Sequence, residues 1–445
     1  MRSRSPAAVL LSAAMLAGGC GSDPPPEPAT PGPPSAAAEA EPERRTRGSA
    51  AAVPSGRLPN APTAVDQAAI GALVETRAQA LGSGRPSAYA SASAPARRED
   101  DATDARRARR LGVRSVRIEG LGIRVRDGRA VASVRMSYRL ARLAGRWNHI
   151  QVLRLRRAGR GGWRVTNVRS RAPRPPWELA SYRRHGSRHF TVLAPEGLDP
   201  DGAGLGASLE AAYARIGERL PGRQRRRYPV VIAADFGDMA AMTSGIRDVG
   251  RLSAITDLSV RTAGPAERVT ALLGVRILIP WPSFVALGPE ARERVLTHEL
   301  AHAVLAPATS GRAPAWLQEG IALYLSGDRR IDAARGAVAG GAGDLTASTS
   351  RLARLARPDA MAPLAGQELS AAYALSSGTA YYVAERFGPQ RLFDLLAAFG
   401  DESLPGRAGP ALNDRITRRI LGVGARRLER DVGSWVRDGA PAMGG

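Results

Sequence analysis

Residues 295–302 read Val295-Leu296-Thr297-His298-Glu299-Leu300-Ala301-His302, and this stretch indicates both a helix and a metal site. The chain of 445 residues has only five histidines, and two of them stand four positions apart here. Four residues are just over one helical turn, so both imidazoles leave the helix on one face. That spacing suits one zinc ion held by two nitrogens, with Glu299 beside it to activate a water molecule.

The flanks of this motif favour a buried helix over a surface helix that carries two unrelated histidines. A helix that is apolar over much of its circumference is expected to lie in a core. Pro289-Glu290 predicts the start of the helix and Pro307 predicts its end. The apolar residues around the motif are Val295, Leu296, Leu300, Ala301, Val304 and Leu305.

A hydrolytic zinc site needs a third protein ligand, with water in the fourth position. No histidine follows His302 in the sequence, so we expect an acidic ligand. The best candidate is Glu319, about a turn and a half into a second helix that Pro314 can begin. The loop of mostly small residues at 306–313 would let this helix turn back on the first.

Together the two segments resemble the gluzincin zinc peptidases, and most closely the peptidase MA-like domain family. The resemblance implies one Zn²⁺ per chain on His298, His302 and Glu319, with Glu299 as the catalytic base. A decayed, non-catalytic version of the same site is the alternative. The family's Trp-Leu-x-Glu-Gly-x-Ala segment is matched by Trp316, Leu317, Glu319, Gly320 and Ala322.

Several positions refine or qualify this resemblance. Some gluzincins carry a carboxylate four residues after the third ligand, and Leu323 stands there instead. Aminopeptidase relatives carry a Gly-x-Met-Glu-Asn segment, which this sequence lacks, so an endopeptidase is favoured. Tyr373 or Tyr381 is a candidate for hydrogen bonding to an oxyanion, against a purely structural role. The resemblance also predicts that the strand at 275–280 forms a sheet edge beside the site.

The N-terminus predicts a bacterial lipoprotein. Arg2 and Arg4 precede an apolar segment from Ala7 to Ala17 that is too short to span a membrane. Residues 16–20 then resemble a lipobox whose Cys20, the only cysteine, would carry the lipid. An ordinary signal peptide with an incidental cysteine is the alternative. We expect a signal peptide at 1–19 and a disordered tether at 20–62.

The remaining sequence predicts an α+β protein with two folded domains. A helix from Thr63, followed by strands of period two up to residue 168, resembles the nuclear transport factor 2-like (SnoaL-like) cone, a curved antiparallel sheet, assigned to 63–172. His149 and Trp147 either line a pocket there or are ordinary sheet residues. A zincin-like domain, assigned to 185–440, would place a small sheet before the metal helix and further helices after it.

The net charge of +23 does not by itself indicate nucleic acid. The basic residues are all arginine, as in proteins encoded by GC-rich genomes, and the densest runs lack the interleaved aromatics of strand-binding surfaces. We therefore predict an extracytoplasmic, lipid-anchored zinc metallopeptidase that acts on peptides or proteins and binds no nucleic acid. An inert zinc-fold scaffold, or a protein that binds a small ligand through its cone domain, is the alternative. The sequence does not indicate an oligomeric state.

Overall fold

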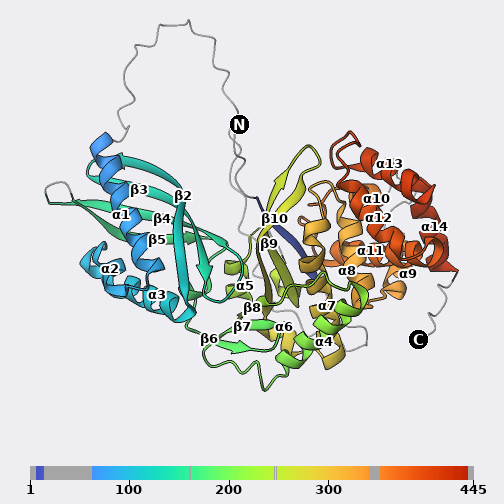
Figure 1. The fold of residues 1–445 in the computed structure, drawn as a ribbon, viewed down its shortest axis with the longest axis horizontal. Coiled ribbons are helices and arrows are strands. Elements are labelled where there is room, and N and C mark those ends of the chain that lie inside the picture. The colour runs from blue at the N-terminus through green and yellow to red at the C-terminus, as the bar shows by residue number, and fades with distance from the viewer. Residues whose placement is uncertain are drawn as a thin grey trace, which may run out of the picture.

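The computed structural model describes residues 7–14, 63–159, 162–244, 246, 248–339 and 351–438. They form two sheets and a helical C-terminal part, so the predicted α+β class is confirmed. Figure 1 shows the four-stranded sheet with its helices at one end, the second sheet in the centre and the C-terminal helices at the other end.

The four-stranded sheet is an antiparallel meander of order β2-β3-β4-β5, with helices packed on one face. Thr63 caps the first helix as predicted, because its hydroxyl accepts a hydrogen bond from the Asp66 amide. Alternate residues of β3 face the helices and are buried, and the others are exposed apart from the buried Ser137. The elements of this unit are α1 (Ala64–Gly82), α2 (Pro86–Ser91), α3 (Arg98–Leu111), β2 (Val113–Arg126), β3 (Arg129–Leu140), β4 (Trp147–Ala158) and β5 (Gly162–Arg171).

The second sheet has the order β1-β9-β10-β8-β7-β6, and its two parallel pairs are β7 with β8 and β8 with β10. The prediction that 275–280 forms the edge was wrong, because β10 lies between β8 and β9. The preceding strand β9 folds back on the outer side of β10, and β1 pairs with β9. The strands are β1 (Ala7–Ala14), β6 (Tyr182–Gly186), β7 (Phe190–Pro195), β8 (Tyr228–Ala233), β9 (Ala254–Ala263) and β10 (Arg268–Pro280).

Helices connect these strands and follow them. None of the helices within the described ranges is long and apolar enough to cross a bilayer. The connecting helices are α4 (Leu205–Arg219) and α5 (Phe236–Met242). After β10 come α6 (Trp281–Val285), α7 (Pro289–Leu305), α8 (Ala315–Ser326), α9 (Ile331–Ala339), α10 (Arg351–Arg354), α11 (Gly366–Phe387), α12 (Gln390–Phe399), α13 (Pro410–Leu421) and α14 (Ala425–Arg437).

The two sheets share a continuous hydrophobic core. Trp177, in the segment between them, is buried and packs edge-on against Tyr138 of β3 with ring centroids 4.6 Å apart. The same cluster includes Trp147 of β4, Ile255 of β9 and Leu278 of β10. The backbone amide of Arg146 also donates to the carbonyl of Leu273, 2.8 Å away. The N-terminal unit therefore packs directly against β9 and β10, which also contact α7.

A buried polar group secures the segment between the sheets. The carboxylate of Glu178 lies 2.9 Å from Nε2 of His149 and accepts a 2.9 Å hydrogen bond from Gln151. Burial opposes ionisation of Glu178, but the His149 imidazole and these hydrogen bonds lower the pKa of its carboxyl to about 2. His149 is thus engaged with Glu178, and Trp147 is buried in the shared core.

We expect this carboxylate to make folding pH-dependent. Its pKa is lower in the folded chain than the ordinary 4.5, so its contribution is complete above pH 4.5 and is lost as the pH falls towards 2. The pKa shift corresponds to a contribution of about 3 kcal/mol to the free energy of unfolding. In urea unfolding, the wild type should have a higher free energy of unfolding than Glu178→Gln at pH 6, and this difference should shrink at pH 3. A difference that does not change with pH would contradict this assignment.

Candidate metal centre

The metal motif lies on two consecutive helices whose boundaries follow the prolines. Helix α7 begins at Pro289, and a short 3-10 turn that contains Pro307 ends it. Pro314 stands immediately before α8, as predicted. The two helices pack together, and the side chains of His298, His302 and Glu319 are each at most 3% exposed.

Three ligand atoms converge between these helices. Nε2 of His298 and Nε2 of His302 are 3.1 Å apart, and Oε2 of Glu319 lies 3.3 and 3.6 Å from them. Donor atoms about 2.0–2.1 Å from a tetrahedral zinc are separated by about 3.3 Å, so the three distances fit one ion. Within the described residues, Oε2 of Glu319 is buried and accepts no hydrogen bond of good geometry. Two imidazoles and a glutamate are also a donor set of hydrolytic zinc sites.

The electrostatics of the cluster favour a cation. Burial opposes ionisation of Glu319, but the two imidazoles outweigh it and lower the pKa of the carboxyl to about 2. Burial lowers the pKa of His298. Burial also disfavours a charged His302, yet the Glu319 carboxylate more than offsets it and raises the His302 pKa. Glu319 is therefore ionised near neutral pH and supplies the negative charge that a bound metal requires.

Glu299 lies beside this cluster and is fully buried. The hydroxyl of Thr256, on β9, lies 2.8 Å from its Oε2 and 2.7 Å from its backbone carbonyl, so it can donate to either. No sequence motif points to Thr256, which is 43 positions away along the chain. A threonine on an apolar strand carries no local signal of such a contact.

The two candidate tyrosines occupy different surroundings. Tyr373 on α11 is buried, and its ring centroid lies 6.4 Å from that of His298. The guanidinium of Arg330 lies over the Tyr373 ring at 5.4 Å. Tyr381 packs against Tyr324, and burial raises the pKa of its hydroxyl to about 12. Of the two tyrosines, Tyr373 is the one beside a candidate metal ligand, His298.

Two residues of the second motif hold α8 in place. A side chain at Gly320 would bring its Cβ within 2.7 Å of the Ser376 carbonyl and 3.0 Å of the Ala380 Cβ on α11. Glycine thus allows the close approach of α8 to α11 that fixes the neighbouring Glu319. Trp316 is buried and donates from its indole to Asn413 Oδ1, 3.2 Å away.

Position 323, where some gluzincins carry a carboxylate, supplies no polar partner to the candidate ligands. Leu323 is buried and apolar, and Nδ1 of His298 is buried without a hydrogen-bond partner in the described part of the chain.

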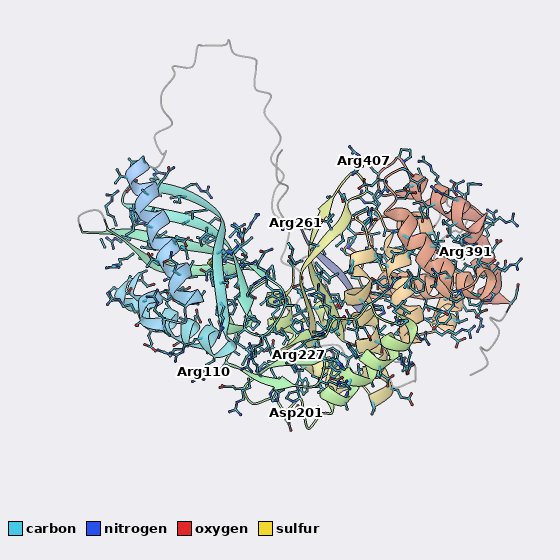
Figure 2. All side chains as sticks on the ribbon, viewed as in Figure 1. Arg110, Asp201, Arg227, Arg261, Arg391 and Arg407 are labelled. Atoms are coloured by element: carbon cyan, nitrogen blue, oxygen red, sulfur yellow. The ribbon has the colours of Figure 1, made fainter. Side chains whose placement is uncertain are left out.

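Two other histidines lie away from the metal centre. His185 is paired with Asp201 at 2.8 Å, and His189 is paired with Glu210 at 2.6 Å. Figure 2 marks Asp201 at the lower edge of the molecule. Cys20 lies outside the described residues.

Comparison with known proteins gave matches to solved structures. No family model matches the chain. No curated protein matches it. Solved structures with similarity include an M1 zinc metallopeptidase from Deinococcus radiodurans (14% identity, TM-score 0.27) and a mutant of it bound to a Tyr-Ser-Ala substrate (15% identity, TM-score 0.28). Each match covers 75% of this chain and 63% of the other, so the chain spans less than two thirds of their length. The functional inference rests on the site residues.

Proposed function

We propose that this protein is a zinc-dependent hydrolase of peptide bonds, of gluzincin type and with a zincin-like catalytic domain. The observation that carries the proposal is the convergence of His298, His302 and Glu319, with Glu299 buried beside them. A bound zinc would polarise the substrate carbonyl and lower the pKa of a water molecule to about 7. The test is zinc analysis of the purified protein together with a peptide-library cleavage screen.

The protein's own residues would handle the proton. Glu299 adjoins the ligand His298 in sequence and has a carboxylate oxygen held by Thr256. It would accept a proton from the attacking water and return it to the leaving nitrogen. The buried walls of α7 and α8 exclude bulk solvent, which strengthens the electrostatic effect of these groups. Tyr373 is proposed as a donor to the oxyanion that forms during attack.

The inert alternative is favoured by one observation. Ligand histidines usually donate their second ring nitrogen to a partner that fixes their orientation, and Nδ1 of His298 has none in the described residues. A protein that bound stoichiometric zinc but cleaved no member of the library would support a scaffolding role.

We also propose that the enzyme is an endopeptidase anchored outside the cytoplasm through lipid on Cys20, with a nuclear transport factor 2-like N-terminal domain. The sequence motifs described above support these assignments. Incorporation of labelled palmitate into the wild type, compared with Cys20→Ser, tests the anchor. Cleavage of peptides that are blocked at both ends tests the endopeptidase assignment.

Thr256 offers a conservative test of the mechanism. Valine has nearly the shape of threonine but lacks the hydroxyl that contacts the Glu299 carboxylate. A hydrogen bond to a charged group contributes about 1.5–3 kcal/mol, so we expect Thr256→Val to lower kcat by roughly 10- to 100-fold. KM and zinc content should change little, and Thr256→Ser should restore much of the rate. Equal kcat values for the valine and serine variants would rule out a role for the hydroxyl.

A further inference from the structure

The strands of the N-terminal unit carry charge of almost one sign. Residues 113–171 include sixteen arginines but only two acidic residues, Glu119 and Asp127. The acidic residues of this unit lie mainly on α1 and α3, which pack on the other face of the sheet; examples are Glu75, Glu99 and Asp104. A coding bias towards arginine would account for the number of basic residues, but not for this separation.

The strand register places four arginines in one row across the sheet. Arg126 of β2 lies opposite Arg129 of β3. Arg129 lies opposite Arg156 of β4, which lies opposite Arg164 of β5. Directly opposed residues share one face with Cβ atoms about 4.5–5.5 Å apart. All four residues are exposed, and we call them the arginine row.

Three of the four arginines in the row are not neutralised by the described part of the protein. Arg126 lies 3.3 Å from its neighbour Asp127, and no described carboxylate lies within 4.0 Å of the other three. Arg164 donates to the backbone carbonyl of Ser91. Like charges directly opposite one another on a sheet destabilise it. More exposed arginines occupy the same face, at positions Arg124, Arg135, Arg139, Arg154, Arg169 and Arg171.

The residues between these arginines indicate the kind of anion that fits. Val131 is 37% exposed, and Ile150 and Val152 are partly exposed, so aliphatic side chains are interspersed among the guanidinium groups. The aromatic residues of the sheet, such as Tyr138 and Trp163, are buried towards the helices. Nucleic-acid surfaces that bind single strands stack bases on exposed aromatics, which the described face lacks. Clusters of several exposed arginines suit the phosphates of an anionic lipid surface.

We propose that the arginine face of β2–β5 binds the surface of an anionic lipid bilayer. The arginine row supplies four closely spaced positive charges, and lipid phosphates supply counter-charges for the three arginines that have no described carboxylate beside them. This binding does not depend on the metal centre or on the lipid predicted at Cys20. It would orient the N-terminal unit towards the membrane and leave the metal centre on the adjoining unit.

The test compares two variants of equal charge. The triple variant Arg129→Gln, Arg156→Gln and Arg164→Gln removes most of the arginine row. Its control is Arg223→Gln, Arg226→Gln and Arg227→Gln, three exposed arginines that precede β8 in the other unit, where Figure 2 labels Arg227. Both changes are made in the full chain with Cys20→Ser, which prevents lipidation. Co-sedimentation is measured with vesicles of phosphatidylglycerol and phosphatidylcholine in equal parts, and with phosphatidylcholine alone.

We expect the parent protein and the control to bind the anionic vesicles, and the row variant to bind at least about tenfold more weakly. Binding should fall with added salt, and none of the three proteins should bind phosphatidylcholine alone. Equal losses in both triple variants, or no binding by the parent, would overturn the proposal. So would tighter, row-dependent binding of duplex DNA. Arg156→Gln alone should shift binding in the same direction if the triple variant does not fold.

Discussion

Replacing Glu299 with glutamine is expected to lower kcat by about 10²- to 10⁴-fold while the protein keeps its zinc. Glutamine has nearly the same shape and can still accept a hydrogen bond from Thr256, but it cannot take a proton from water. Glu299 is outside the three-atom cluster that fits the metal, so its substitution should leave those distances unchanged. The two readouts are the initial rate on a peptide found in the library screen and the zinc content per chain.

A matched control lies on the same helix. Glu290 is in the first turn of α7 and its side chain is 93% exposed, so Glu290→Gln makes the same chemical change away from the metal centre. It should cleave at the rate of the wild type. Wild-type activity in Glu299→Gln would contradict the general-base role. Loss of zinc from that variant would instead indicate that Glu299 is a ligand.

The local parts of the site could be predicted because short-range physics determines them. The spacing of His298 and His302 fixes their common face, and proline marks the start of α7. Glu319 was inferred from the need for an acidic third ligand and from a loop that lets the second helix turn back, and the family resemblance then supported it, since helix periodicity alone does not state how two helices pack. Gly320 shows the physical basis of that match, because its missing side chain allows the contact with α11.

Long-range features were missed because they leave no periodic trace in the sequence. The sequence predicts only strands after the helix that starts at Thr63, yet residues 98–111 form α3, whose alanines Ala102, Ala105 and Ala108 are buried. Charged residues dominate the composition of this helix, so its narrow face of alanines does not give a recognisable hydrophobic pattern in the sequence. The order of β9 and β10 likewise depends on a hairpin that folds back on the sheet, and that order brings Thr256 to Glu299.

Glu319→Gln is expected to abolish stoichiometric zinc binding, with an affinity loss greater than the 10- to 100-fold typical for an outer partner of a ligand. The variant keeps the size of the side chain but removes the negative charge from a cluster that is at most 3% exposed. Two neutral imidazoles then remain to hold a divalent ion in a buried site. Because zinc binds the folded chain, its addition should raise the Tm of the wild type and not that of the variant.

The pH dependence adds an independent check on this assignment. Glu319 has its pKa at about 2, whereas the His302 pKa is raised, so protons compete with zinc first at the His302 imidazole as the pH falls. The zinc-induced rise in Tm of the wild type should therefore disappear in mild acid, well above pH 2. Glu368→Gln, an exposed position on α11, should behave as the wild type throughout. An equal zinc-induced rise in Tm for Glu319→Gln would show that another group completes the metal centre.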